Sequence, residues 1–175
     1  MLTRIQIIQG DIAVQDVEAV VNAANPSLLG GGGVDGAIHR AAGPGLLEEC
    51  RTLGGCSVGD AKITKGHKLA AGWVIHVVGP VWRGGGEGEA ELLACAYRRA
   101  LEEAVKVGAK TVAFPAISTG AYGYPKDEAA KIAIAVIRDF SAAHPQLEEV
   151  RLVCFSEDSA SAHRRALAEA GGDRQ

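Results

Sequence analysis

The chain has 175 residues, of which 47% are apolar and 22% charged, and its formal net charge is −3. This length suits one domain that buries a core without the support of disulfide bonds or metal ions. Lys and Arg are scattered along the chain, which makes long nucleic acid a poor candidate partner. No apolar run is long enough to span a membrane, and residues 1–9 lack the apolar core of a signal peptide.

The four cysteines (Cys50, Cys56, Cys95 and Cys154) show no C-x-x-C pair and no histidine at zinc spacing. We therefore expect reduced thiols, no bound metal and a cytoplasmic location. We also expect a monomer.

Short apolar runs and helical periodicity predict the elements in chain order. Strands are expected over 3–9, 17–22, 61–64, 73–78, 111–114 and 150–155, and helices over 34–42, 46–53, 87–107, 125–140 and 159–170. The connection around Gly66 could close a hairpin, and residues 84–88 are expected to form a flexible loop. Residues 1–170 are expected to form a single domain, with 171–175 a frayed tail.

Strands that alternate with helices from residue 34 onward predict an α/β fold with a largely parallel central sheet. The two opening strands have no helix between them, so we expect a mixed sheet. Ligands of such sheets bind at the carboxyl ends of the strands. Two loops, after Val21 and after Phe114, leave strand ends and can face one crevice.

The first of these loops carries four consecutive glycines, Gly30 to Gly33, directly before a helix. Glycines let the backbone approach a ligand closely, and a helix start presents bare N–H groups to an anion. The stretch 31–36 formally matches G-x-G-x-x-G, but it lies too far from the strand end for a Rossmann site, and no Gly-Lys-Ser/Thr follows. A nicotinamide-dependent oxidoreductase is therefore disfavoured.

The second loop, 118–123, has small residues and two glycines before a helix. It is compatible with a tight turn and with a second backbone cradle for a phosphate group. Two cradles around one diphosphate suit a dinucleotide-like ligand and require neither a lysine nor a metal.

Several motifs together resemble one family. Gly10-Asp11-Ile12, the run Val20-Val21-Asn22-Ala23-Ala24-Asn25, the sequence Gly-Gly-Gly-Val-Asp-Gly and the stretch 114–125 are similar, in order and spacing, to a macrodomain of the MacroD type. The resemblance covers nearly the whole chain. It implies a three-layer α/β/α sandwich, an ADP-ribose site and hydrolysis at the distal ribose, with no cofactor.

The resemblance also implies which residues bind the ligand. The adenine would contact Asp11 and Ile12 and stack on Phe155. The two loops would hold the rest of the ligand through Asn25, Gly32, Gly33, Val34, Ser118, Thr119, Gly120, Ala121 and Tyr122.

Each of these residues also has a structural interpretation. Asp11 and Asn25 could be turn residues, Phe155 a core aromatic of its strand, and Asp35 the cap of a helix. The resemblance instead places Asn25 on the distal ribose hydroxyls and Asp35 beside the anomeric carbon, which makes both catalytic.

Three further polar residues are interpreted as structural. We expect Asn22 to brace the first loop through backbone hydrogen bonds. His39, four residues after Asp35 on the same helix face, could tune Asp35 or a phosphate but fits a hydrogen-bonded structural histidine better. We expect His76 to be a satisfied polar group of the core.

The resemblance thus implies a hydrolase that removes mono-ADP-ribose from acidic protein side chains and deacetylates O-acetyl-ADP-ribose. Its partners would be ADP-ribose, O-acetyl-ADP-ribose and mono-ADP-ribosylated proteins. The alternative is a reader module that binds ADP-ribose without turnover.

Overall fold

A computed structural model describes residues 2–171 of the chain. Its strands are β1 (Arg4–Gln9), β2 (Ala19–Ala23), β3 (Ala61–Lys65), β4 (Trp73–Val77), β5 (Thr111–Phe114) and β6 (Glu149–Cys154). Its helices are α1 (Gly33–Ala42), α2 (Pro44–Arg51), α3 (Glu89–Lys106), α4 (Lys126–Ala143) and α5 (Glu157–Glu169), with a short 3-10 helix η1 (Ile12–Val14). The predicted strands and helices are confirmed within a few residues at each end, whereas η1 was not predicted. The predicted frayed tail, apart from Gly171, lies outside the described residues.

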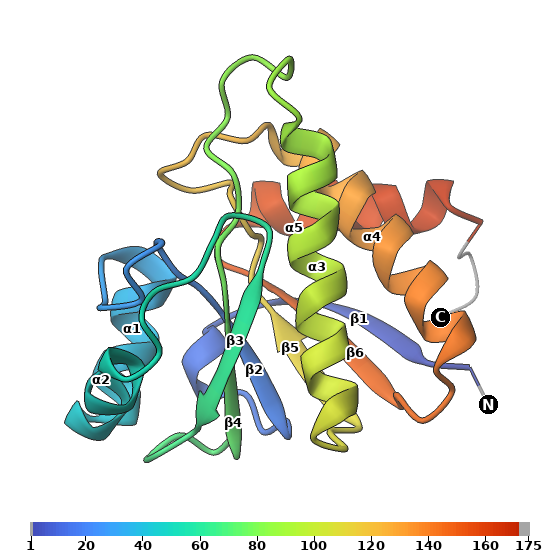
Figure 1. Cartoon of the computed structure of the whole chain (residues 1–175). Helices are drawn as coiled ribbons and strands as arrows, with labels where there is room; N and C mark the ends of the chain where they lie inside the picture. The colour runs from blue at the N-terminus through green and yellow to red at the C-terminus, as the bar shows by residue number, and fades with distance from the viewer. Residues whose placement is uncertain (1, 172–175) are drawn as a thin grey trace.

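The strands form one sheet in the order β1-β6-β5-β2-β4-β3 (Figure 1). All neighbouring strands are parallel except β3 and β4, which form the antiparallel hairpin around Gly66. The mixed, largely parallel sheet is therefore confirmed, but the reason given for it is wrong. The two opening strands are not neighbours, because β1 pairs with β6 while β2 lies between β5 and β4.

Helices cover both faces of the sheet. Alternate strand residues point to opposite faces, so Val21 and Ile75 pack in the larger core under α3, α4 and α5. Val20 and Val74 pack in the smaller core with α1, α2 and η1. This arrangement confirms the three-layer α/β/α sandwich.

The carboxyl ends of β1, β2, β4, β5 and β6 meet at one edge of the sheet, which is uppermost in Figure 1. Because β3 runs antiparallel to β4, the start of β3 lies at this edge as well. The two loops singled out in the sequence both leave this edge, after β2 and after β5. The fold therefore brings them to one place.

Two simpler properties follow from the described residues. The four cysteines are free thiols. None of the helices within 2–171 combines the length and the apolarity that crossing a bilayer requires.

Tyr97 of α3 connects the larger core to the loop after β5. Its ring is fully buried 5.1 Å from that of Phe114. Its hydroxyl accepts a hydrogen bond from the Ile117 N–H at 3.3 Å and donates to the Pro115 carbonyl at 3.5 Å. The helix thus fixes the start of the second loop from inside the core.

We predict that Tyr97→Phe lowers the free energy of unfolding by about 1–3 kcal/mol, because the buried Ile117 N–H loses its acceptor. Denaturant unfolding measures this quantity. Unchanged stability would mean that the backbone of the loop needs no support from α3.

Candidate functional site

A cavity of 330 Å³ lies between the two loops at the carboxyl edge. One wall is the end of β2 with the glycine loop and the start of α1, and the other is the loop after β5. The lining residues are Ala23, Ala24, Asn25, Gly31, Gly32, Gly33, Val34, Asp35, Gly79, Ala116, Ile117, Ser118, Gly120, Ala121 and Tyr122. The structure therefore brings together most of the residues predicted for the two cradles.

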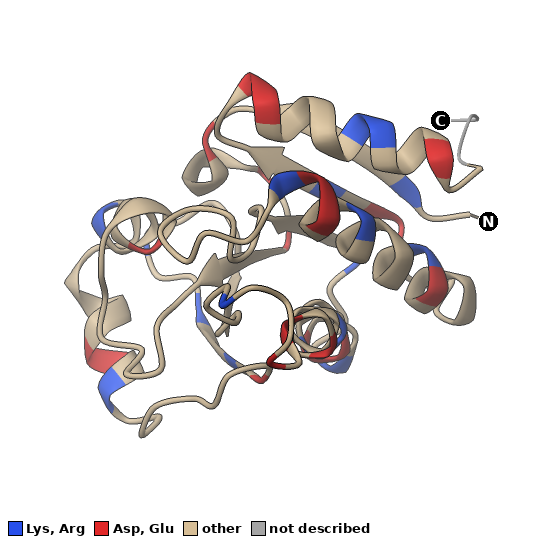
Figure 2. Ribbon diagram, turned by 90° about the horizontal axis from the view of Figure 1, so that it is seen from above, with Lys and Arg blue, Asp and Glu red and all other residues tan. Residues whose placement is uncertain are grey.

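The lining contains no Lys or Arg, and Asp35 is its one ionisable carboxyl group. Figure 2, which looks down on this edge, shows largely uncharged loops, with the charged residues gathered mainly on the helices. An anion in this cavity would therefore be held by backbone N–H groups rather than by cationic side chains.

The start of α1 supplies such N–H groups. The helix begins after Gly32, which caps it without any side-chain hydrogen bond. The first residue, Gly33, has a φ of +56°, a conformation that disfavours residues with a Cβ. The N–H groups of the first turn are thus presented to the cavity, together with the positive end of the helix dipole.

The loop after β5 forms the opposite wall. Ser118 adopts a φ of +69°, which is uncommon for a residue with a side chain. It is buried, and its Oγ has no hydrogen-bond partner among the described residues. Gly120, Ala121 and Tyr122 line the cavity with it, whereas Thr119 does not. The Thr119 hydroxyl donates to the Ala116 carbonyl at 2.9 Å.

Asp35 is the third residue of α1 and is only 4% exposed. It does not cap the helix, so the capping interpretation is wrong. Its Oδ1 accepts a hydrogen bond from Asn22 Nδ2 at 2.9 Å. Its Oδ2 faces Gly31, where a Cβ would lie 3.2 Å from Oδ2 and 3.4 Å from Asn25 Nδ2. One carboxylate oxygen is thus held by the fold, and the other lies with Asn25 Nδ2 beside the backbone of Gly31, where a side chain would be crowded.

Asn22 itself is held by His76. The parallel register pairs the two residues on β2 and β4. Asn22 Nδ2 lies 3.1 Å from His76 Nδ1, and His76 Nε2 lies 3.0 Å from Thr64 Oγ1. The prediction that Asn22 braces the loop backbone is therefore wrong, because its side chain braces Asp35. His76 is the buried and hydrogen-bonded core residue that was predicted.

Burial, and secondarily the nearby His39, lower the pKa of His76 to about 3, so its ring is neutral. The NH₂ group of Asn22 can only donate, and it lies within hydrogen-bond distance of both Asp35 Oδ1 and His76 Nδ1. His76 Nδ1 is therefore the acceptor. This assigns the proton of His76 to Nε2, from which it is donated to Thr64. Asn22 thus donates to both His76 and Asp35, and the Asp35 carboxylate acts as an acceptor.

His39 lies beside the same carboxylate. Its Nε2 is 3.4 Å from Asp35 Oδ1, but the contact lacks hydrogen-bond geometry. The side chain is mostly buried, and Nε2 has no other hydrogen-bond partner among the described residues. His39 is therefore adjacent to Asp35, as the helical spacing predicts, without being hydrogen-bonded to it.

Asn25 organises the glycine loop. Its Nδ2 donates to the Gly30 carbonyl at 3.0 Å, and its Oδ1 accepts from the Ser27 N–H and hydroxyl at 3.1 and 2.6 Å. The turn interpretation is thus correct as a description of its contacts. It does not exclude a role toward a ligand, because Asn25 also lines the cavity.

The residues predicted for adenine lie at neighbouring strand ends, outside the lining of the cavity. Gln9 of β1 is in register with Cys154 of β6, so Asp11 and Phe155 follow adjacent strands. Asp11 Oδ1 accepts from the Ala13 N–H at 2.9 Å, as a turn carboxylate would, and its Oδ2 has no partner within residues 2–171. Phe155 is 92% exposed, so the core interpretation of this aromatic is wrong. Ile12 is buried in the smaller core.

Six lining residues were not predicted: Ala23, Ala24, Gly31, Gly79, Ala116 and Ile117. Two of them are glycines. Gly31 stands between Asn25 and Asp35, and the sequence does not distinguish it from its three neighbouring glycines. Gly79 follows β4, and a Cβ there would overlap Ser118 Oγ and approach Ile117 Cγ2 to 2.6 Å. The sequence feature that could have indicated Gly79 is its position two residues after the end of the strand Trp73–Val77.

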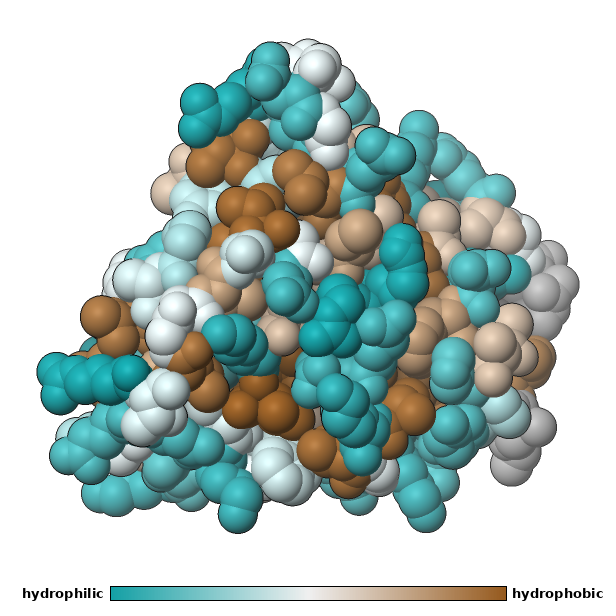
Figure 3. Space-filling model, viewed as in Figure 1, coloured by the Kyte–Doolittle hydropathy of each residue, from teal (hydrophilic) through white to brown (hydrophobic). Residues whose placement is uncertain are grey.

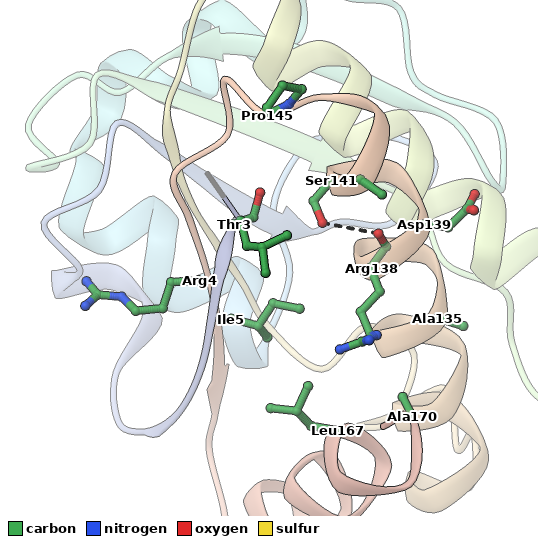
Figure 4. A pocket seen from close by; sticks show the side chains of 12 residues that line it. Thr3, Arg4, Ile5, Ala135, Arg138, Asp139, Ser141, Pro145, Leu167 and Ala170 are labelled. Atoms are coloured by element: carbon green, nitrogen blue, oxygen red, sulfur yellow. Dashed lines mark hydrogen bonds between the residues drawn. The ribbon is translucent and has the colours of Figure 1, made fainter. Parts of the chain in front are cut away.

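Another cavity, of 680 Å³, lies at the opposite end of the sheet. Figure 4 shows the side chains of Ile5, Leu167 and Arg138 around it, from β1, α5 and α4. It adjoins the amino end of β1, whereas ligands of open α/β sheets bind at the carboxyl ends. It also lacks the convergence of buried polar groups found at Asp35. Within residues 2–171, no cluster of three or more His, Cys, Asp or Glu side chains could hold a metal ion.

Comparisons with known proteins agree with this geometry. The family model described as "Macro domain" matches residues 21–133. A Macro domain-containing protein of Methanosarcina mazei is 56% identical, over 96% of this chain and 90% of its own length. An O-acetyl-ADP-ribose deacetylase of Cronobacter sakazakii is 53% identical, over 97% of this chain and 96% of its own. The solved structure of an Oceanobacillus iheyensis macrodomain with ADP has a TM-score of 0.91 and 42% identity, over 96% of this chain and 92% of that one. The chain belongs to the Macro domain family.

Proposed function

We propose that this protein binds ADP-ribose and hydrolyses ester bonds at its distal ribose. The substrates are O-acetyl-ADP-ribose, which would be deacetylated, and proteins that carry mono-ADP-ribose on acidic side chains. The observation that carries the proposal is the buried carboxylate of Asp35, which Asn22 holds at 2.9 Å with its second oxygen toward the cavity. Similar proteins named O-acetyl-ADP-ribose deacetylase support the same chemistry.

The ligand would lie along the carboxyl edge of the sheet. Adenine would occupy the surface between Asp11 and Phe155, where the free Oδ2 of Asp11 can accept from the exocyclic amine and the exposed ring can stack on the base. Such stacking contributes about 1–3 kcal/mol per base. The structure of a Trypanosoma brucei macrodomain in complex with ADP-ribose, 42% identical to this chain, supports a ligand of this class.

The diphosphate would lie between the two backbone cradles. Gly33 and Val34 at the start of α1 line the cavity together with residues of the loop 118–122. The Oγ of Ser118, buried without a partner, is one candidate donor. Recognition by backbone amides and one hydroxyl suits a diphosphate in a site without Lys or Arg.

Hydrolysis would occur over Gly31. Asp35 Oδ2 would accept a hydrogen bond from a water molecule and polarise it for attack on the ester, and Asn25 would orient the ribose hydroxyls. The water oxygen would add to the ester carbonyl carbon, and the bond from that carbon to the ribose oxygen would break. The proton that Asp35 takes from the water would pass to the leaving ribose oxygen, which gives a free carboxylic acid and ADP-ribose. The substrate diphosphate could assist as a second acceptor for the same water.

The alternative function is a reader that binds ADP-ribose without turnover. Adenine and diphosphate recognition would be the same for a reader. The alternative gives no role to a buried carboxylate that three polar residues position. Release of ADP-ribose from a glutamate-linked mono-ADP-ribosylated protein, or of acetate from O-acetyl-ADP-ribose, decides between the two.

We predict that Gly32→Glu abolishes ADP-ribose binding and keeps the fold. A Cβ at Gly32 meets nothing within 4 Å, so the side chain is accommodated, but its charge would repel the diphosphate. Calorimetry measures the affinity, and thermal unfolding checks the fold.

The matched control is Gly86→Glu, which adds the same charge at a position that is equally open and outside the cavity. Unchanged affinity in the Gly32 variant would show that the glycine loop is a connector.

We predict that Asp35→Ala slows hydrolysis by roughly 10²–10⁴, the range for loss of a general base. Affinity for ADP-ribose should change far less, because adenine and diphosphate contacts lie elsewhere. Single-turnover release of ADP-ribose measures the rate. Near-normal release by a folded Asp35→Ala protein would leave the substrate's own phosphate as the activating group.

We predict that His76→Phe lowers turnover more than it lowers affinity. Without His76 Nδ1, the Asn22 amide loses one of its two acceptors and Asp35 is held less firmly. The variant also leaves Thr64 unpaired, which costs about 1–3 kcal/mol of stability. The measurement is kcat together with the ADP-ribose Kd, at a temperature where the variant is folded.

Thr64→Val is the control, because it removes a partner of His76 but leaves the hydrogen bond to Asn22. Equal losses of turnover in the two variants would assign His76 a purely structural role.

A further inference from the structure

A second cavity, of 440 Å³, adjoins the candidate site. The two cavities share Gly79 and Tyr122 in their walls, and Pro26, the neighbour of Asn25, lines the second one. The remaining lining comes from the segment before β3, the loop between β4 and α3, and the first turns of α3. We refer to this cavity as the β3–β4 groove.

The sheet order gives the β3–β4 groove its place relative to the ligand. In the proposed function, adenine lies over β1 and β6, the diphosphate over β5 and β2, and the distal ribose near β2 and β4. The next position along the same edge is the end of β4 and the start of β3. The groove is therefore at the end of the site from which the group esterified to the distal ribose would leave.

Hydrogen bonds attach the walls of the groove to both cradles. The Trp82 N–H donates to the Tyr122 carbonyl at 2.8 Å, and the Cys56 N–H donates to the Pro26 carbonyl at 2.8 Å. A ligand group in the groove would thus be positioned by the same elements that position the reacting ester.

The glycine-rich loop between β4 and α3 is also organised. The Glu89 carboxylate accepts from the N–H groups of Arg83, Gly85 and Glu87 at 2.8, 3.1 and 2.7 Å. Burial alone would raise the pKa of Glu89, but these N–H groups outweigh burial and lower the pKa to about 2. The sequence predicted a flexible loop here, and the structure instead shows a loop held by one carboxylate.

The lining chemistry suits a polypeptide. Val58 and Val81 line the groove while remaining 41% and 40% exposed, and Leu92 lies with them. Figure 3 shows apolar side chains gathered on this face beneath the loop between β4 and α3. Three charged residues also line the groove: Arg83, Glu87 and Glu89. The Glu89 carboxylate is engaged by N–H groups of the loop, and the Arg83 guanidinium forms no ion pair among the described residues. An apolar surface that continues the wall of the candidate site fits a chain segment with an apolar residue close to the modified side chain.

We propose that the β3–β4 groove binds the polypeptide that flanks the modified acidic side chain of an ADP-ribosylated protein. The inference rests on the proposed function and adds a substrate subsite to it. An acetyl group is too small to reach this surface, so O-acetyl-ADP-ribose does not use it. The groove therefore distinguishes protein substrates from the small-molecule ester.

The test compares the two substrates in Val81→Glu. We expect kcat/KM for a glutamate-linked mono-ADP-ribosylated protein to fall about tenfold or more, since a charge replaces an apolar contact. The value for O-acetyl-ADP-ribose, and the affinity for free ADP-ribose, should stay within about twofold. Leu2→Glu is the control, because Leu2 is also exposed and apolar but lines the cavity at the opposite end of the sheet.

Equal effects of Val81→Glu on both substrates, or no effect on either, would overturn the groove as a polypeptide subsite. Absence of hydrolysis by the wild-type chain would instead overturn the proposed function. In that case binding affinities test whether the groove binds polypeptide. A modified peptide should bind more tightly than free ADP-ribose, and Val81→Glu should remove the difference.

Discussion

The hydrogen bond from Asn22 to Asp35 connects the sheet of this protein to its candidate chemistry. A carboxylate that is only 4% exposed requires compensating donors, because burial of an unpaired charge is costly. The amide of Asn22 supplies one donor, and the register of β2 against β4 places His76 where it holds that amide. The position of Asp35 in the cavity is therefore set by strand pairing as well as by the helix that carries it.

The walls of the site are built on a different principle. In the proposed function, a lining without Lys or Arg holds the diphosphate through N–H groups whose directions are fixed by the backbone, so no long side chain has to be ordered on binding. Such recognition requires a defined backbone conformation in both loops. This requirement is met by the left-handed backbone of Gly33 and Ser118, by the missing side chain of Gly79 and by the support of Tyr97 from the core. These features define the backbone path of the two loops.

The order of the strands gives the site a direction. Residues suited to a base, a diphosphate and a reacting ester follow one another along a single edge, and the β3–β4 groove continues the same line. Because β3 is antiparallel, the segment that leads into it lies at this edge, and Val58 of that segment lines the groove. The antiparallel hairpin thus extends the surface on which an extended substrate could lie.

The sequence by itself determined the fold class, the strands and helices other than η1, and the two loops that line the cavity. Apolar runs and helical periods are local, and glycines before a helix have few other uses, so these features can be recognised without coordinates. Tertiary structure alone decided what the polar side chains contact. Asn22 and His76 are far apart in the chain, and only strand register makes them neighbours of Asp35. The position of Gly31 among four glycines, the exposure of Phe155 and the hold of Glu89 on the loop between β4 and α3 were equally hidden, because each depends on where segments distant in sequence meet in space.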